Sequence, residues 1–130
     1  MTDAPLARLK DRRNPINPAR EVILHPDRIE WVEEGRLERR IALDAVTSVR
    51  LSVELAGQQS QVVCRVGGPS GEIVFGSRKA VSPGVWEDNA LEFQTLLVRV
   101  HEALRPRFGA VRFTEGQTLG FRLLMGGIGV

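Results

Sequence analysis

Short apolar runs separated by turn-forming residues fill the first half of the chain after residue 20. The clearest run is Ser48–Ala56, where Val and Leu alternate with polar residues, as a strand with one face on a core and one in water requires. Similar runs lie at 21–25, 28–33, 36–43, 61–66 and 72–75. Most are followed by turn signals such as Pro-Asp, Glu-Gly or Gly-Gly-Pro. The pattern predicts about six strands.

The apolar period changes after a loop of small and turn-forming residues at 76–85. Apolar residues then recur three and four positions apart, as on one face of an amphipathic helix: Phe93, Leu96, Leu97, Val100, Ala103 and Leu104. Asn89 or Asp88 can cap this helix, with Glu92 placed to bond back to the cap amide, and Pro106 ends it. The sequence therefore predicts an α+β, mainly β fold. We expect a small antiparallel sheet or partly open barrel of six to seven strands, capped by one C-terminal amphipathic helix.

The two ends of the chain differ from this body. Residues 1–20 contain three prolines and no sustained apolar period, which predicts an extended or disordered basic arm before a domain at 21–105. Residues 106–130 begin as a basic connector and end in eight residues without a polar side chain. A bilayer span needs about 20 apolar residues. We therefore expect either the start of a membrane segment that continues past the given sequence, or a final hairpin that pairs 111–114 with 121–125.

Composition fits one globular domain and places the charge unevenly. The chain has 130 residues, of which 42% are hydrophobic and 26% charged, which argues against a disordered chain and a multi-spanning membrane protein. The net charge of +2 divides into +3 over 1–20, −4 over 21–104 and +3 over 105–130. An acidic body with few aromatic residues does not favour nucleic acid as a partner. The basic flanks offer candidate contacts to an anionic membrane surface: Arg8, Lys10, Arg12, Arg13, Arg105, Arg107 and Arg112.

Catalytic and metal-binding patterns are not found in the sequence. His25 and His101 are far apart, and neither has the nearby Cys, His or carboxylate spacing of a metal site. Cys64 shares a predicted strand face with Val62 and Val66, which favours a buried, inert thiol. A single cysteine also favours a reducing compartment. We therefore expect no catalytic residue, no cofactor and no metal.

Three segments in this order resemble the bacterial pleckstrin-homology-like domains of small, uncharacterised membrane-associated proteins. They are the strand pair Leu24-His-Pro-Asp-Arg-Ile-Glu-Trp31, the strand and corner at 41–51, and the helix at 87–104. The resemblance covers roughly 21–104 and implies a binding or scaffolding module. Members that grip phosphoinositides carry several cations around the first loop. Here that loop, 25–28, has one arginine beside an aspartate, so headgroup binding there is not expected.

The hypothesis that follows is a non-enzymatic PH-like interaction module at the cytoplasmic face of the membrane, which binds a protein or peptide partner. The partner is expected at an exposed sheet edge, in the groove between sheet and helix, or at the loop 76–87, with Trp86, Arg78 and Lys79 as candidate groove residues. The alternative is electrostatic attachment to an anionic membrane or to nucleic acid through the basic flanks. The sequence does not specify the oligomeric state.

Overall fold

A computed structural model describes residues 5–13, 19–56, 59–82 and 85–115 of the chain. These residues form a mainly β structure with one α-helix, which confirms the expected fold class. The strands are β1 Ala7–Asp11, β2 Arg20–Leu24, β3 Arg28–Glu33, β4 Arg36–Ala42, β5 Ser48–Ala56, β6 Gln59–Gly68, β7 Gly71–Gly76, β8 Arg78–Ser82, β9 Val85–Asp88 and β10 Arg112–Glu115. The helices are α1 Ala90–Ala103 and two short 3-10 helices, η1 Leu43–Ala45 and η2 Arg105–Ala110.

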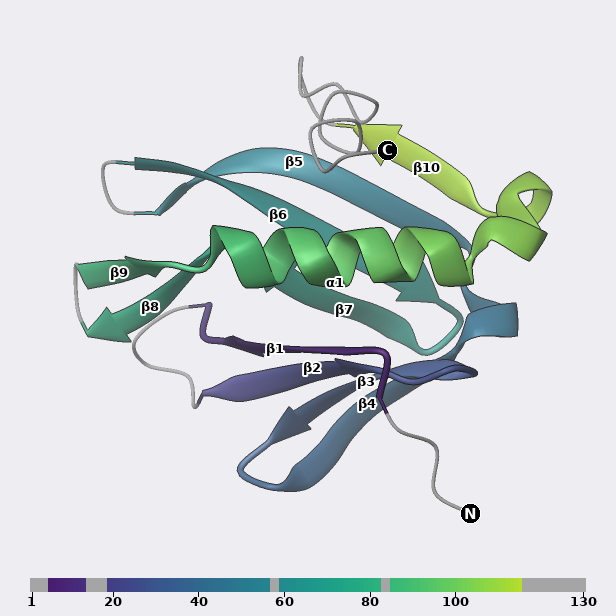
Figure 1. Cartoon of the computed structure of the whole chain (residues 1–130), viewed down its shortest axis with the longest axis horizontal. Coiled ribbons are helices and arrows are strands. Elements are labelled where there is room, and N and C mark those ends of the chain that lie inside the picture. Colours follow the sequence, from purple (N-terminus) through teal and green to yellow (C-terminus); the bar gives the residue numbers. More distant parts are fainter. Residues whose placement is uncertain (1–4, 14–18, 57–58, 83–84, 116–130) are drawn as a thin grey trace.

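The strands form two four-stranded sheets and a separate hairpin (Figure 1). One sheet has the order β1-β2-β3-β4 and is antiparallel throughout. The other has the order β10-β5-β6-β7, in which β5 to β7 are antiparallel and β10 runs parallel to β5. Within the described residues, strands β8 and β9 form a two-stranded sheet of their own. The six strands predicted from the sequence are β2 to β7, and the sheets in the described part of the chain do not close into a barrel.

Strand β1 lies in the segment that we expected to be an arm outside the domain. It pairs with β2 along its whole length, so residues 7–11 belong to the N-terminal sheet. Leu9 and Asp11 face inward and are both buried. Because one of these two inward positions carries a carboxylate, β1 lacks the apolar alternation that identifies a strand in a sequence.

In two further segments the strands or their partners differ from those that the sequence predicted. The expected loop at 76–85 contains β8, which pairs with β9 in a hairpin just before the helix. The segment expected as the first half of a C-terminal hairpin is β10, and it pairs with the distant strand β5. The proposed second half, 121–125, and the terminal apolar stretch lie outside the described residues.

Helix α1 covers the line where β1 and β7 lie beside each other (Figure 1). It buries Phe93, Leu96, Leu97 and Val100, as the apolar stripe predicted. The Phe93 ring packs against Phe75 of β7, with ring centres 5.5 Å apart. The core therefore joins both sheets and the helix, and it includes Cys64.

The N-terminus of α1 differs from the predicted capping box. The Asn89 side chain makes no capping bond; its Nδ2 donates to the Lys10 carbonyl, 3.1 Å away, and so ties the helix to β1. Asp88 Oδ1 accepts from the Ala90 amide instead, at 3.1 Å. No helix among residues 5–13, 19–56, 59–82 and 85–115 is long and apolar enough to cross a membrane.

Candidate functional site

An open pocket of about 470 Å³ brings together four arginines and two tryptophans. We call it the arginine–tryptophan pocket. Its lining consists of Arg13, Arg20, Trp31, Arg39, Glu54, Gln61, Val63, Arg65, Glu72, Val74 and Trp86. The two tryptophans are the only ones in the chain. The pocket therefore concentrates the residue types that most often dominate binding surfaces.

The strand pattern explains why one wall of the pocket is polar. On β6, Val63 and Arg65 flank the core residue Cys64, and on β7, Val74 lies between two other core residues. Because neighbouring residues of a strand point to opposite faces, the pocket lies on the face of this sheet that is turned away from the core. Arg65 and Val74 are cross-strand partners on that face.

Trp31 of β3 is contacted by two of the arginines. The guanidinium carbon of Arg20 lies 4.4 Å from the Trp31 ring centre, and that of Arg39 lies 5.5 Å from it. Arg39 is the residue directly opposite Trp31 on β4, so the sheet register sets this second contact. The indole Nε1 donates to Glu33 Oε1 at 3.1 Å, which holds the ring in place. Both arginines therefore form cation–π contacts with the Trp31 ring.

Arg13 links three strands beside Trp86. Its Nη2 donates to Asp11 Oδ1 at 2.6 Å and to the Arg78 carbonyl, while Nη1 donates to Gln61 Oε1 at 3.0 Å. Its guanidinium carbon lies 5.9 Å from the Trp86 ring centre. Burial raises the pKa of Asp11, although the charge and hydrogen bond of Arg13 act in the opposite direction. Arg13 is thus a structural cation that already has a carboxylate partner.

Arg65 also has a carboxylate partner within the pocket. Its Nη1 donates to Glu54 Oε2 at 2.7 Å and to Ser52 Oγ at 3.1 Å. The hydrogen bond from Arg65 is the main reason why the pKa of Glu54 lies below its usual value. Glu72, on the next strand, lies 3.8 Å from Arg50 Nη2. The acidic members of the lining therefore neutralise part of its positive charge.

Two glycines at the ends of β7 leave room for arginine side chains. A Cβ atom at Gly71 would lie 2.8 Å from the guanidinium carbon of Arg39, and one at Gly76 would lie 2.7 Å from that of Arg13. These separations are shorter than van der Waals contact, so a side chain at either position would displace the guanidinium group. Gly71 also has a φ of +126°, which residues with a Cβ rarely adopt.

Two of the three residues predicted for a partner groove line different pockets of the described part of the chain. Trp86 lines the arginine–tryptophan pocket, and Arg78 contributes its backbone carbonyl to Arg13. Lys79 pairs with Glu87 at 3.4 Å and lines a separate hollow of about 310 Å³ beside β1. The separation follows from the strand geometry, because adjacent residues of β8 and β9 point to opposite sides of the hairpin.

The flanking residues predicted to contact a membrane are distributed over several parts of the fold. Arg8 pairs with Glu21 at 3.5 Å, and Lys10 is exposed next to it on β1. Arg12 and Arg13 follow β1, where the Arg12 carbonyl accepts from the Ala80 amide at 2.8 Å.

The C-terminal members of this set lie beyond α1. Arg107 Nη1 donates to the carbonyls of Leu43 and Val46 at 2.7 and 2.8 Å, so this side chain fastens η2 to η1 and its neighbour. Arg105 and Arg112 are exposed. The guanidinium groups of Arg13 and Arg107 therefore donate hydrogen bonds within the fold, which leaves them less free to contact a membrane surface.

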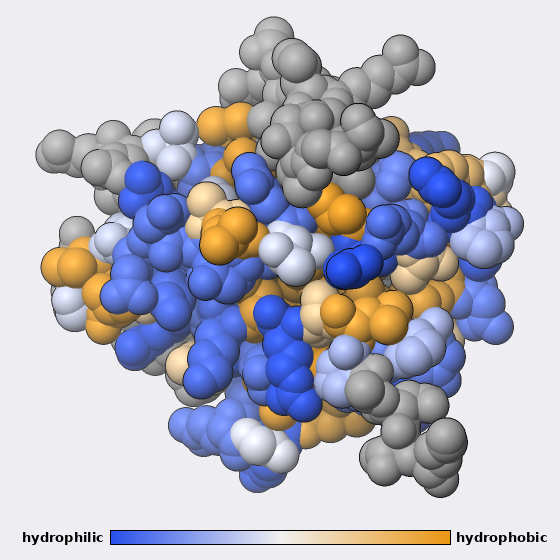
Figure 2. All heavy atoms as spheres, in the orientation of Figure 1, coloured by the Kyte–Doolittle hydropathy of each residue, from blue (hydrophilic) through white to orange (hydrophobic). Residues whose placement is uncertain are grey.

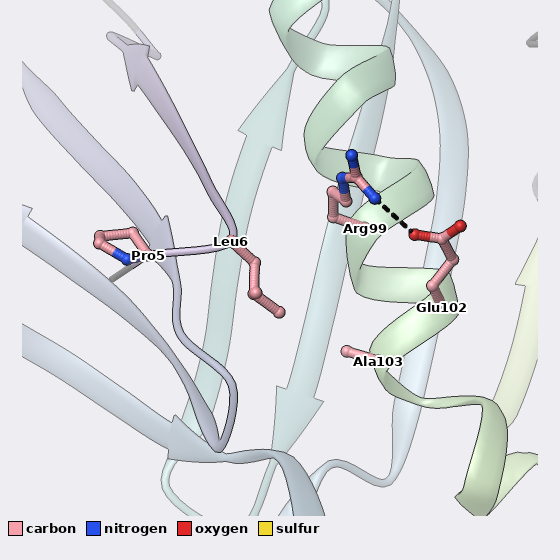
Figure 3. A pocket seen from close by; sticks show the side chains of 5 residues that line it. All are labelled: Pro5, Leu6, Arg99, Glu102 and Ala103. Atoms are coloured by element: carbon pink, nitrogen blue, oxygen red, sulfur yellow. Dashed lines mark hydrogen bonds and ion pairs between the residues drawn. The ribbon is translucent and has the colours of Figure 1, made fainter. Parts of the chain in front are cut away.

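That a partner binds in the groove between sheet and helix stays a prediction. A hollow lies between helix α1 and the residues just before β1 (Figure 3). It has a volume of about 530 Å³ and is lined by Pro5, Leu6, Arg99, Glu102 and Ala103. Arg99 and Glu102 form an ion pair at 3.1 Å across its edge, so their charges satisfy each other (Figure 3). Figure 2 shows hydrophilic side chains over most of this face of the molecule, with smaller hydrophobic patches between them.

The histidines and the cysteine lie outside these pockets. Cys64 is fully buried, and burial raises the pKa of its thiol. His25 Nε2 lies 3.0 Å from Glu30 Oε1, and the His101 ring packs against Phe108 and Phe113. In the described part of the chain, His, Cys, Asp and Glu side chains do not gather in a group that could hold a metal ion.

Sequence reasoning did not identify Arg20, Arg39 and Arg65 as members of a site. Arg39 lies on an edge strand, where an arginine is usually a solvated charge, but its Nη1 donates to the Glu72 carbonyl at 2.6 Å. The signal available in the sequence is the pair of glycines Gly71 and Gly76, one at each end of a predicted strand. The arginines that lie against these glycines, Arg39 and Arg13, come from the other sheet and its edge. The spacing of the two glycines in the sequence therefore could not identify them.

Comparison with known proteins gives little further information. Neither the known protein families nor the curated proteins contain a match to this chain. Among solved structures, the chain is similar to the hSac2 domain of the human phosphoinositide phosphatase Sac2, with a TM-score of 0.47 and 10% sequence identity. The likeness covers 88% of this chain and 76% of that one.

Proposed function

We propose that the chain is a non-enzymatic PH-like interaction module that binds an acidic segment of a protein partner in the arginine–tryptophan pocket. The observation that carries this proposal is the gathering of four arginines and both tryptophans around one hollow. We also propose that this module lies at the cytoplasmic face of the membrane.

The charge of the pocket supports an acidic ligand. Four arginines and two glutamates line it, which leaves a net charge of +2 on the lining, and two of these arginines come from the basic segment 1–20. The low dielectric of the pocket walls concentrates this potential and attracts anions. Trp31 and Trp86 add flat apolar surfaces beside the cations, so a ligand gains both charge pairing and burial of apolar area.

The lining of the pocket favours binding over catalysis. Among the residues that the structure describes, the side chains around it include no cysteine, histidine, serine or lysine. Its two carboxylates are Glu54, which is paired with Arg65, and Glu72, which lies near Arg50. A nucleophile with an adjacent base is therefore missing from the lining residues, and this is the arrangement that covalent or acid–base chemistry requires.

Attachment through the basic flanks has weaker support. Arg13 and Arg107, two members of that set, are held by hydrogen bonds inside the fold. Arg8 already has a carboxylate partner at its surface position. Surface attachment needs cations that are open to solvent and grouped together, and Arg13 and Arg107 do not meet that requirement.

The natural fluorescence of the protein provides a direct test. The chain has no tyrosine, and both of its tryptophans line the pocket, so its fluorescence reports on the pocket alone. We expect a short capped poly-glutamate peptide to change the tryptophan emission in a saturable way. The same peptide with glutamine in place of glutamate should leave the emission unchanged.

A matched pair of variants locates the binding. Arg39 lies against Trp31, whereas Arg40 is the next residue of β4 and is exposed. Arg39→Gln should weaken binding of the poly-glutamate peptide by about tenfold, the effect of losing one charge-assisted hydrogen bond. Arg40→Gln removes the same charge and should have little effect. Equal losses in the two variants would instead indicate non-specific attraction and would contradict the proposal.

A further inference from the structure

We propose that the acidic group bound by the pocket is a phosphate monoester on a side chain of the partner, held by Arg20 and Arg39 beside Trp31. This inference rests on the proposed function and specifies its ligand. The inference depends on the ion pairs of the four arginines in the lining. Two of them, Arg13 and Arg65, form ion pairs with carboxylates, and Arg20 and Arg39 form none with the described residues.

Arg20 is a buried cation with an unused donor. The residue is only 9% exposed, and its Nε makes no hydrogen bond within the described part of the chain. Burial lowers the pKa of Arg20, which Asp11 and Glu33 only partly offset through their charges. A buried charge without a direct partner is costly. A bound anion at the pocket would supply the acceptor that this guanidinium group lacks.

Arg39 approaches the same indole from β4. Its Nη1 donates to the Glu72 carbonyl at 2.6 Å, and the remaining nitrogens form no ion pair with any carboxylate of residues 5–13, 19–56, 59–82 and 85–115. Because Arg20 and Arg39 share Trp31 as a neighbour, one ligand with several anionic oxygens can bridge them. Guanidinium groups present forked donors that match phosphate oxygens.

The charge balance favours a phosphate over a carboxylate. Arg13 and Arg65 are neutralised by Asp11 and Glu54, at 2.6 and 2.7 Å. Arg20 and Arg39 then remain beside Trp31 as two guanidinium groups without an ion pair to a described carboxylate, although Glu33 and Glu72 offset part of their charge. A carboxylate carries one negative charge, whereas a phosphate monoester carries between −1.5 and −2 at about pH 7 and has three acceptor oxygens.

The two glutamates of the lining limit the ligand to one phosphate group. Glu54 and Glu72 stand on the β5–β7 wall of the pocket. A second phosphate would find Arg65 already paired with Glu54 and would lie near the carboxylate of Glu72. This arrangement disfavours polyphosphorylated headgroups and nucleic-acid backbones and favours a singly phosphorylated side chain. We therefore assign the ligand to a phosphorylated peptide segment.

The test uses three capped peptides of one sequence, in which a central residue among alanines and glycines is phosphoserine, aspartate or serine. Binding to the full chain is measured by tryptophan emission. We expect the phosphoserine peptide to bind at least about tenfold more tightly than the aspartate peptide, because its phosphate can engage Arg20 and Arg39, the two arginines without an ion pair, at the same time. The serine peptide should not bind.

Variants show whether the two arginines cause that preference. In Arg39→Gln the ratio between the phosphoserine and aspartate affinities should fall to about twofold, while in Arg40→Gln it should stay at its original value. Arg20→Lys keeps the buried positive charge but removes the forked donors of the guanidinium group. This variant should also reduce the ratio between the phosphoserine and aspartate affinities. Circular dichroism checks that each variant folds, and the more exposed Arg39 gives the answer if Arg20→Lys does not fold.

The outcomes separate this inference from the function on which it rests. If the phosphoserine and aspartate peptides bind equally well, the phosphate assignment is wrong and the acidic-peptide function stands. If neither these peptides nor poly-glutamate binds, the proposed function fails as well. If vesicles that contain a singly phosphorylated phosphatidylinositol bind while the phosphopeptide does not, the ligand is a lipid and the inference is overturned.

Discussion

The guanidinium group of Arg39 occupies the space that a side chain at Gly71 would fill. A Cβ atom at Gly71 would lie 2.8 Å from both the guanidinium carbon and Nη1 of Arg39. Arg39 belongs to the N-terminal sheet and Gly71 begins β7 in the other sheet. The glycine thus allows an arginine of one sheet to reach Trp31 and the pocket while it donates to the backbone of the other sheet.

Gly71→Ala should impair both folding and binding. The φ of +126° at this position disfavours any Cβ, and the contact would displace Arg39, so we expect a loss of about 1 kcal/mol or more in the free energy of unfolding. Affinity for acidic peptides should fall as well. Gly35→Ala is the matched control, because Gly35 has a φ of +78° but nothing within 4 Å of its Cβ position.

Urea denaturation and peptide titration measure the two effects separately. Gly35→Ala should lower the stability and leave the peptide affinity unchanged. If Gly71→Ala also leaves the affinity unchanged, Arg39 does not hold the ligand.

Glu54→Gln should strengthen the binding of acidic peptides. The carboxylate of Glu54 accepts from Arg65 at 2.7 Å, and its loss would free Arg65 and raise the net charge of the pocket by one. We expect an affinity gain of about threefold to tenfold, measured by tryptophan emission. Glu38→Gln is the control, because Glu38 is an exposed residue of β4 outside the pocket lining. An equal gain in both variants would mean that overall charge, and not Arg65, sets the affinity.

His101 should make the stability of the fold depend on pH. Burial and the charge of Arg105 lower the pKa of His101 below 6.5, with Glu102 acting in the opposite direction. The unfolded chain then binds the proton more readily than the folded one, so stability falls as the pH decreases through 6.5 towards the folded-state pKa.

His101→Gln removes this titration, so the stability of the wild type relative to the variant should decline between about pH 7.5 and 5. Urea denaturation at several pH values measures the difference. A constant difference across that range would show that His101 has the same pKa in both states.

The aromatic pair between α1 and β7 should be essential for stability. Phe93 is 1% exposed and packs against Phe75. Phe93→Ala should lower the free energy of unfolding by about 3–5 kcal/mol, the cost of removing a buried phenyl ring. Leu91→Ala, at a helix position that is 72% exposed, should change it by less than about 0.5 kcal/mol. Comparable losses in both variants would contradict the packing of α1 described above.

The fold could be predicted where each strand carries its own apolar alternation. Val49 and Leu51 face the core and their strand has the predicted bounds, because these positions alternate with polar residues in the sequence itself. Strand β1 was not predicted, because its inward Asp11 is stabilised by Arg13 and its apolar pattern is incomplete. A strand at 111–114 was predicted as one arm of a C-terminal hairpin, but the parallel pairing of β10 with β5 was not, because β5 is distant in the sequence.

The candidate site could be predicted only in part. Trp86 was identified as a groove residue, and it lines the pocket. Arg20, Arg39 and Arg65 belong to three different strands, and they meet only because two sheets pack together. Nothing in the local sequence of an arginine indicates whether it will end beside a tryptophan or in water. The charge totals of the flanks were equally misleading, since Arg13 contributes to a basic segment and yet serves the pocket.

The central claim, that the pocket between Trp31 and Trp86 binds an acidic ligand, is tested most directly by NMR. The chain has two tryptophans, so its spectrum should contain two indole N–H signals, and both side chains line the pocket. On titration with the phosphoserine peptide we expect both signals to shift with one common dissociation constant. If the peptide binds and neither indole signal moves, the ligand lies elsewhere on the protein and the account is contradicted.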